Sequence, residues 1–294
     1  MNESRRPRAR RGAPSGGAPG ERALRERLAA LYPASSRRTL KQWLEAGRVA
    51  VNGHVVRRGD VTVAAADHVT LGAPALPACP APLRLVHEDD EILVVDKPPG
   101  LLTIATERER ERTAYRLLTE YVRAREGRRL FVVHRLDRET SGLVVFAKSP
   151  AAKQGLQAQF GGRRVERVYV AVVEGSLRDA TGTLQSRLAE DRARRVRPAR
   201  GGAGGREAIT HYTVLARGGQ ATRLELRLET GRRAQIRVQL AALGHPIVGD
   251  HAHGSRRDPL RRLCLHATRL GFVHPRGAPV RFESAPPPAF LRLA

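Results

Sequence analysis

A ten-residue polar segment between two short apolar runs constrains the fold of this chain more than any other stretch. The segment is His134–Leu143, HRLDRETSGL, and the apolar runs are Leu130–Val133 before it and Leu143–Ala147 after it. Apolar runs of that length bounded by polar residues are typical of buried strands. The sequence therefore predicts a tight loop on a rigid scaffold, with Asp137 at its centre. Two interpretations are open: a solvated turn that bonds to its own backbone, or a functional site of the kind that loops carry.

The excess of arginine restricts what the protein can bind. The formal net charge is +24, and the only lysines are Lys41, Lys97, Lys148 and Lys153. A chain this basic is expected to bind a polyanion, nucleic acid before a membrane surface. No apolar run approaches the ~20 residues that span a bilayer, and the N-terminus lacks the apolar region of a secretory signal. The two cysteines, Cys79 and Cys264, follow no metal-ligand pattern, which fits a reducing cytoplasm.

The first 82 residues predict a small folded module between two low-complexity segments. Residues 1–21 are rich in Arg, Gly and Pro and predict a disordered basic tail, and residues 73–82 are rich in Ala and Pro and predict a linker. Residues 22–72 contain leucines at helical spacing, a second helix that starts at Ser36, and alternating strand residues around Asn52-Gly53. Asn-Gly between strands is a strong signal for a hairpin turn.

Part of this module, RRTLKQWLEAGRVAVNG at residues 37–53, resembles the small αL RNA-binding module first known from a ribosomal protein. In that family two helices and the turn after them present basic side chains to structured RNA. The resemblance covers residues 22–72, and it implies RNA contacts by Arg37, Arg38, Lys41 and Arg48. A generic helix–hairpin unit with a solvated basic face is the alternative.

Residues 83–294 predict an α+β domain with a mostly antiparallel sheet. Helices are expected from Thr113, from Ala151 to Phe160 and from Gln235 to Leu243, and short strands joined by turns fill much of the rest. The Arg/Gly-rich segment Glu190–Glu207 is expected to be a flexible loop. The sequence contains neither a P-loop nor a dinucleotide-binding fingerprint.

Several motifs of this domain resemble the RluA family of RNA pseudouridine synthases. They are EDDEILVVDKPPG at 88–100, HRLDRETSGL at 134–143, RVYVAVVEG at 167–175, TGRRAQIR at 230–237 and GHPIVGD at 244–250, and the resemblance spans residues 83–285. The family isomerises uridine to pseudouridine within RNA, with one carboxylate and without a cofactor or metal. The resemblance implies the same reaction here.

The resemblance also assigns roles to five residues. Asp137 is the implied nucleophile, and attack at the sugar C1′ and attack at the pyrimidine ring both stay open. Tyr169 would pack on the base and assist proton transfer at C5, and Ile236 would pack against the uracil. Arg237 would pair with Asp137 and keep it ionised. Arg135 would fill the gap left by the flipped-out uridine.

One residue departs from the family pattern. The family usually has histidine where this chain has Ala234, which puts a local contact and the site selectivity in doubt. His245, His251 and His253 lack acidic or cysteine partners at ligand spacing, so loop histidines are expected rather than a metal site.

The expected partner is RNA, without a membrane partner, and the expected protein is a cytoplasmic monomer. Ribosomal RNA of the large subunit is the first expectation for the substrate, and transfer RNA is the second. The target should lie in a loop or flexible strand, because A-form helices hide base edges. A non-catalytic RNA-binding or ribosome-assembly factor on the same scaffold is the alternative.

Overall fold

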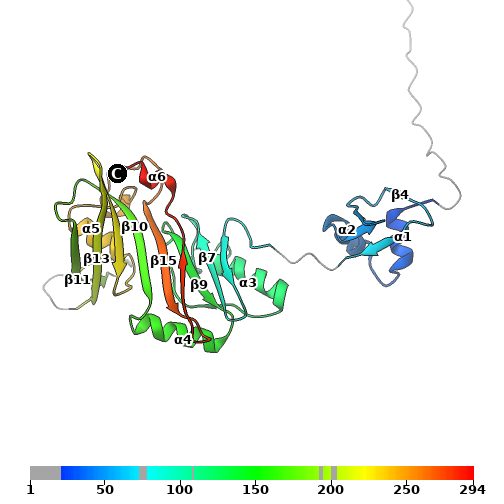
Figure 1. Ribbon diagram of the computed structural model, residues 1–294, viewed down its shortest axis with the longest axis horizontal. Helices are drawn as coiled ribbons and strands as arrows, with labels where there is room; N and C mark the ends of the chain where they lie inside the picture. The colour runs from blue at the N-terminus through cyan, green and yellow to red at the C-terminus, as the bar shows by residue number, and fades with distance from the viewer. Residues whose placement is uncertain (1–20, 73–77, 108, 192–194, 200–203) are drawn as a thin grey trace, which may run out of the picture. The chain divides into compact units, whose positions relative to one another are not determined.

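The structure, a computed structural model, describes residues 21–72, 78–107, 109–191, 195–199 and 204–294. The chain divides into two compact units, Met1–Leu76 and Pro77–Ala294, which Figure 1 draws and which are described separately here. Residues 1–20 of the predicted tail and 73–77 of the predicted linker lie outside the described residues.

The N-terminal unit packs two helices against short strands. Helix α2 (Arg37–Glu45) begins where expected because the Ser36 hydroxyl accepts a hydrogen bond from the Thr39 amide at 3.1 Å. Asn52 and Gly53 have φ of 50° and 83°, so the predicted hairpin turn forms. The remaining elements are β1 (Arg22–Ala23), α1 (Leu24–Leu31), β2 (Val49–Val51), β3 (His54–Val55), β4 (Thr62–Val63) and β5 (Val69–Leu71). Their shared core consists of buried Leu24, Leu28, Leu40, Leu44, Val49 and Val63.

An eleven-stranded sheet forms the larger unit (Figure 1), in the order β12-β11-β13-β14-β10-β15-β9-β7-β6, with β16 beside β15 and β8 beside β9. The strands are β6 (Arg84–Glu88), β7 (Ile92–Lys97), β8 (Phe131–Val132), β9 (Ser141–Ala147), β10 (Glu166–Glu174), β11 (Thr181–Glu190), β12 (Val196–Pro198), β13 (Arg206–Arg217), β14 (Ala221–Leu228), β15 (Leu265–Val273) and β16 (Pro279–Glu283). All neighbouring pairs are antiparallel except β9 and β15, which run parallel at Ser141–Gly142. The predicted α+β class with a mostly antiparallel sheet is confirmed.

Two helices cover opposite faces of the sheet around β7 and β9. Alternate residues of a strand point to opposite faces, and accordingly Leu93 and Val95 pack with α3 (Ala114–Glu126), whereas Ile92 and Val94 pack with α4 (Pro150–Gly161). Both faces of β9 are therefore buried, and the polar segment before it is fixed to a rigid strand. The remaining helices, α5 (Gln235–Ala242) and α6 (Pro288–Leu291), follow β14 and β16.

The expectation of a flexible loop at Glu190–Glu207 is wrong for part of that segment. Strand β12 pairs with the end of β11, with Ala189 opposite Arg197, and β13 already begins at Arg206. Strand β11 itself was not expected. Its exposed and partly buried residues alternate, but most of them are polar, so no apolar period marks the strand in the sequence. Residues 192–194 and 200–203 of the segment lie outside the described residues.

Candidate active site

The backbone on both sides of Asp137 is held by the segment that follows β7. On one side, the buried Thr103 hydroxyl donates to the Leu136 carbonyl at 2.9 Å and accepts from the Leu136 amide at 3.1 Å. On the other, the Arg138 carbonyl accepts from the amide of Gly100 at 2.9 Å and from the ammonium of Lys97 at 3.1 Å. These bonds leave little freedom to the residue between them.

Lys97 is fully buried, and its sequence context indicated only the end of a strand. Its ammonium also donates to the carbonyls of Pro98 and Leu101, both at 2.8 Å. Burial lowers the pKa of Lys97 to about 7. In its charged form the ammonium has three protons, and these two bonds and the bond to Arg138 use all of them. Lys97 therefore ties the Lys97–Leu101 turn to the loop that carries Asp137.

Arg237 of α5 lies between two carboxylates. Its Nε and Nη2 each donate to the Asp250 carboxylate at 2.7 Å, and its Nη1 lies 3.7 Å from the Asp137 carboxylate. Burial opposes the charge of Asp250, but hydrogen bonds from Arg237 and His253 outweigh it and lower the pKa of Asp250 to about 2. The two bonds to Asp250 thus fix the orientation of the guanidinium, and in this orientation Nη1 points at Asp137. The sequence did not single out Asp250.

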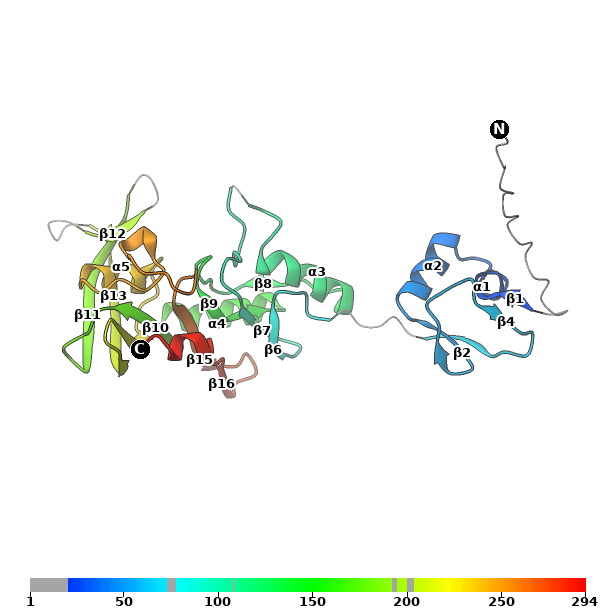
Figure 2. The same ribbon diagram turned by 90° about the horizontal axis from the view of Figure 1, so that it is seen from above.

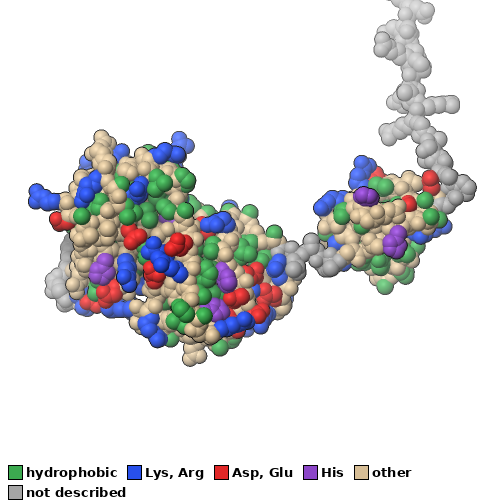
Figure 3. All heavy atoms as spheres, in the orientation of Figure 1, with side chains coloured by type: hydrophobic (Ala, Val, Ile, Leu, Met, Phe, Trp, Pro, Cys, Tyr) green, Lys and Arg blue, Asp and Glu red, His purple; other side chains and the backbone are tan. Residues whose placement is uncertain are grey.

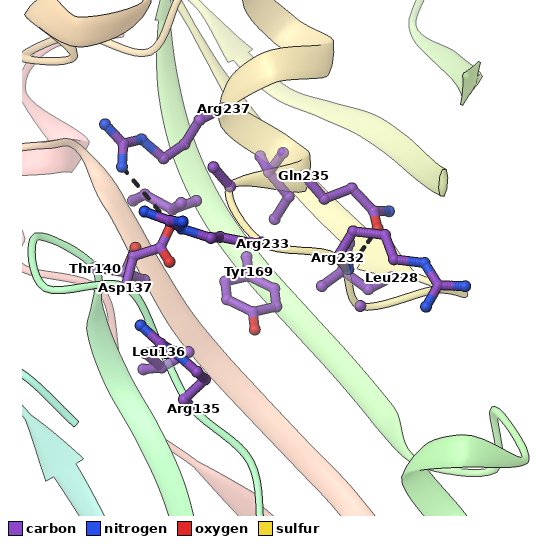
Figure 4. A pocket seen from close by; sticks show the side chains of 14 residues that line it. Arg135, Leu136, Asp137, Thr140, Tyr169, Leu228, Arg232, Arg233, Gln235 and Arg237 are labelled. Carbon is purple, nitrogen blue, oxygen red and sulfur yellow. Dashed lines mark hydrogen bonds and ion pairs between the residues drawn. The ribbon is translucent and has the colours of Figure 1, made fainter. Parts of the chain in front are cut away.

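Tyr169 lies on β10 and is 9% exposed. Burial raises the pKa of Tyr169 to about 12, so its phenol stays protonated at physiological pH. It shares a cavity of about 210 Å³ with Asp137, Ile236 and Arg237, which we call the Asp137 cavity. Figure 4 shows Asp137 and Tyr169 pointing into the same space, with Arg237 reaching Asp137 from α5. Exposed Arg135 also lines this cavity, so the structure brings all five residues singled out in this domain together.

A wider groove continues from Asp137 between β12, α5 and the segment before α3. Its volume is about 680 Å³, and six arginines of the described part of the chain line it, namely Arg135, Arg138, Arg195, Arg197, Arg233 and Arg237. Strand β12 and the segment before α3 project from the same side of the sheet (Figure 2). On the face drawn in Figure 3, by contrast, acidic and basic side chains of the larger unit are mixed. The groove is therefore a local concentration of positive charge beside the carboxylate.

Ala234 lies at the rim where the Asp137 cavity meets this groove. It precedes α5 and has φ of 50° and ψ of 23°, a left-handed conformation that Ala adopts at a cost. The residue at position 234 therefore contributes both to the lining of the cavity and to the start of the helix that carries Arg237.

The four candidate RNA-binding residues of the N-terminal unit differ in how freely they can reach a ligand. Arg37, Arg38 and Lys41 are exposed on α2. Arg48 is partly buried: its Nε donates to the Gly72 carbonyl at 3.1 Å, and its guanidinium lies 5.3 Å from the centre of the Trp43 ring. Arg57 and Arg58, which the sequence did not single out, line the same hollow as Arg37 and Lys41.

No group of three or more His, Cys, Asp or Glu side chains among the described residues is arranged to hold a metal ion. His253 instead bonds to Asp250, with Nδ1 3.0 Å from Oδ1. Within the part of the chain that the structure describes, no helix has the length and apolar character needed to cross a bilayer.

Comparison with protein families matches both units. Residues 91–242 match the family model described as RNA pseudouridylate synthase, and residues 26–69 match the S4 domain. Ribosomal large subunit pseudouridine synthase D of Vibrio cholerae is 35% identical over 296 residues, which cover 92% of this chain and 89% of the relative. The enzyme of the same name from Haemophilus ducreyi is 34% identical over 295 residues, with the same coverage.

Among solved structures, Human RNA Pseudouridylate Synthase Domain Containing 1 superposes with a TM-score of 0.57 at 26% identity, over 69% of this chain and 83% of that chain. Both family resemblances seen in the sequence are confirmed by these matches.

Proposed function

This chain belongs to the RNA pseudouridylate synthase family, and from that premise we propose that it isomerises specific uridines of large-subunit ribosomal RNA, with Asp137 as the reacting carboxylate. The 34–35% identity to synthases named for the large ribosomal subunit, over 92% of the chain, supports the choice of RNA. The arrangement of Asp137 between fixed backbone bonds, with Arg237 at 3.7 Å, is the observation that supports the choice of residue.

The isomerisation breaks the bond from C1′ to N1, forms a bond from C1′ to C5, and moves one proton from C5 to N1. Asp137 would act by adding either to the sugar C1′ or to the pyrimidine ring, and it would leave again once C5 is bonded to C1′. Arg237 would stabilise the carboxylate when it leaves again. Because burial keeps Tyr169 a neutral phenol, its hydroxyl can accept the C5 proton while donating its own. Ile236 and the Tyr169 ring would hold the detached uracil and exclude water.

RNA docking would divide between the two units. Arg37, Arg38 and Lys41 of the S4 domain would contact RNA outside the target, and the six arginines of the groove beside Asp137 would contact the strand that carries the uridine. Arg135, at the mouth of the Asp137 cavity, would stack in the gap left by the flipped base. We propose that the protein acts as a monomer, because one chain supplies the whole constellation. We also propose that it acts in the cytoplasm, because its proposed substrate is ribosomal RNA.

The test is a site-resolved map of pseudouridine in total RNA from strains with and without the gene. The proposal predicts that one or a few sites in large-subunit ribosomal RNA disappear and return when the wild-type gene is restored. Loss of sites in transfer RNA alone would overturn the choice of substrate. A map that does not change would contradict the assignment as an active synthase.

A further inference from the structure

A second cavity adjoins the Asp137 cavity on the other side of Tyr169. It has a volume of about 400 Å³ and shares Arg135, Tyr169, Leu228, Gly231 and Arg232 with the first. Figure 4 shows Arg232 and Leu228 on the side of Tyr169 that faces away from Asp137. We call this space the Arg167 cavity, after a residue that lines this cavity but not the Asp137 cavity. None of the roles assigned above uses it.

Arg167 is 8% exposed, and its charge is incompletely compensated. Its Nη2 donates to the Glu229 carbonyl at 3.1 Å, while its buried Nε has no hydrogen-bond partner. Among the described residues it forms no ion pair. A buried charge without a partner is costly, and such groups usually indicate a missing ligand or a functional role. The Arg167 side chain lines a cavity that shares five lining residues with the Asp137 cavity.

The surroundings of Arg167 favour an anion. Arg135, Arg163 and Arg232 line the same cavity, and among the described residues Glu229 is its only acidic lining residue. That carboxylate is already engaged, since it lies 2.9 Å from Arg163 Nη1.

The aromatic side of the cavity adds no charge. The Arg167 guanidinium lies 5.8 Å from the centre of the Phe160 ring, and His134 stacks on that ring with centroids 4.5 Å apart. Burial and the nearby Arg167 lower the pKa of His134 to about 3, so it is neutral. The arginines therefore determine the sign of the potential.

We propose that the Arg167 cavity binds a backbone phosphate next to the target uridine, with Arg167 as its principal ligand. The inference rests on the proposed function, because Arg167 precedes Tyr169 by two residues on β10. Residues i and i+2 of a strand face the same side about 7 Å apart, so a nucleotide on Tyr169 brings a flanking phosphate within reach. A planar guanidinium with free N–H groups suits phosphate oxygens. Filling this site would fix the register of the strand that presents the uridine.

Gly231 offers an independent way to disturb the site. A Cβ atom built on Gly231 would overlap Nη1 of Arg167, so this position admits only glycine while the guanidinium stays where it is. Gly231→Ala should therefore displace the guanidinium without removing its charge. Arg164 is a matched control, because it is exposed, is near in sequence and does not line the cavity.

The experiment uses synthetic RNAs that span the mapped uridine, each with one neutral methylphosphonate linkage at successive positions around it. For the full-length wild-type protein, one linkage next to the uridine should weaken binding by about tenfold, as expected for loss of a charged hydrogen bond. With Arg167→Met the unmodified RNA should bind about tenfold more weakly, and the penalty at that linkage should vanish. Arg164→Met should keep both the affinity and the penalty. Gly231→Ala and Arg167→Lys should give partial loss at the same linkage.

The phosphate site is overturned if the methylphosphonate linkage reduces the RNA affinity of wild type and of Arg167→Met by the same factor. If the wild type still forms pseudouridine in that case, the proposed function stands. Failure of the wild type to form pseudouridine in the unmodified RNA would overturn the proposed function instead. If Arg167→Met does not fold by circular dichroism, an undiminished penalty in Gly231→Ala and Arg167→Lys overturns the inference, and a diminished one supports it.

Discussion

The basic side chains around Asp137 and those on α2 are held in opposite ways. The Arg237 side chain is 15% exposed and is fixed by two 2.7 Å bonds to Asp250. The Lys41 side chain is 78% exposed, and its only ion pair among the described residues is a 3.7 Å contact with the exposed Glu45. An exposed pair of this kind contributes little to stability.

This difference matches two different tasks. Chemistry benefits from charges that are already oriented before the reaction begins, because no free energy is then spent on reorganising them. Docking to a phosphate backbone needs charge that can adapt to the partner, and exposed side chains provide it. We therefore expect substitutions around Asp137 to change the rate of the chemical step, and substitutions on α2 to change affinity and its dependence on salt.

The largest expected effect comes from releasing Arg237. Asp250→Asn removes the charge that fixes the guanidinium, so Nη1 should lose its orientation toward Asp137. The single-turnover rate at saturating RNA should fall about 100-fold, which is typical of small misplacements in an active site, while the dissociation constant for RNA stays the same. The exposed Asp179→Asn is the matched control and should leave both quantities unchanged. A rate loss explained entirely by weaker RNA binding would contradict the positioning role.

The next effect tests how tightly the Asp137 loop is attached to the sheet. Gly142 has φ of 113°, and a Cβ atom there would collide with the backbone of Ala267 on β15. Gly142→Ala should therefore lower the free energy of unfolding of the larger unit by about 3 kcal/mol, from strain and overpacking together. Calorimetry of the purified protein measures the change. An unfolding temperature equal to that of the wild type would show that this junction is not rigid.

A smaller effect is expected on α2. Replacing Arg37, Arg38 and Lys41 together by Gln should weaken RNA binding by about tenfold and reduce the slope of log affinity against log salt by about 2. The turnover number at saturating RNA should stay the same. A control that replaces the exposed arginines Arg123, Arg227 and Arg292 of the larger unit should change the slope less. Equal changes in the two triple variants would indicate general charge attraction and not a docking surface.

The smallest effect is expected at Gly155, where no neighbouring atom would exclude a larger side chain. Gly155 lies within α4 and is exposed, and a Cβ atom there would meet nothing within 4 Å. Gly155→Ala should raise the free energy of unfolding by about 0.5–1 kcal/mol through helix propensity. Calorimetry should show opposite shifts for Gly155→Ala and Gly142→Ala. A destabilised Gly155→Ala would mean that this surface also packs against something.

The motifs of the sequence predicted the members of the Asp137 cavity but not what holds them in place. Asp137, Tyr169 and Arg237 were found because they lie in segments that resemble a known family. Asp250 is also part of such a segment, yet its role depends on a pairing across 13 residues that only the fold creates. Thr103 belongs to no motif, and its two bonds to Leu136 span 33 positions. Side-chain to backbone bonds of this kind leave no period or spacing in a sequence.

The sheet shows a similar limit. Strands with buried apolar residues, such as β10 and β14, were predicted from their composition. Strand β11 was missed because it is half exposed and polar, and β12 was missed because arginine and glycine around it favour a loop. Pairing between β11 and β13 stabilises both strands and cannot be read from either alone. Of these two missed strands, β12 forms one wall of the groove beside Asp137.

The most direct test of the account is the Asp137→Asn variant in a single-turnover assay with saturating RNA. The carboxamide keeps the shape of the side chain but is a poor nucleophile and carries no charge. We predict that the rate of pseudouridine formation falls by about 10⁴-fold or more, while circular dichroism and the dissociation constant for RNA match those of the wild type. Pseudouridine formation by Asp137→Asn at a rate comparable with that of the wild type would contradict the assignment of Asp137.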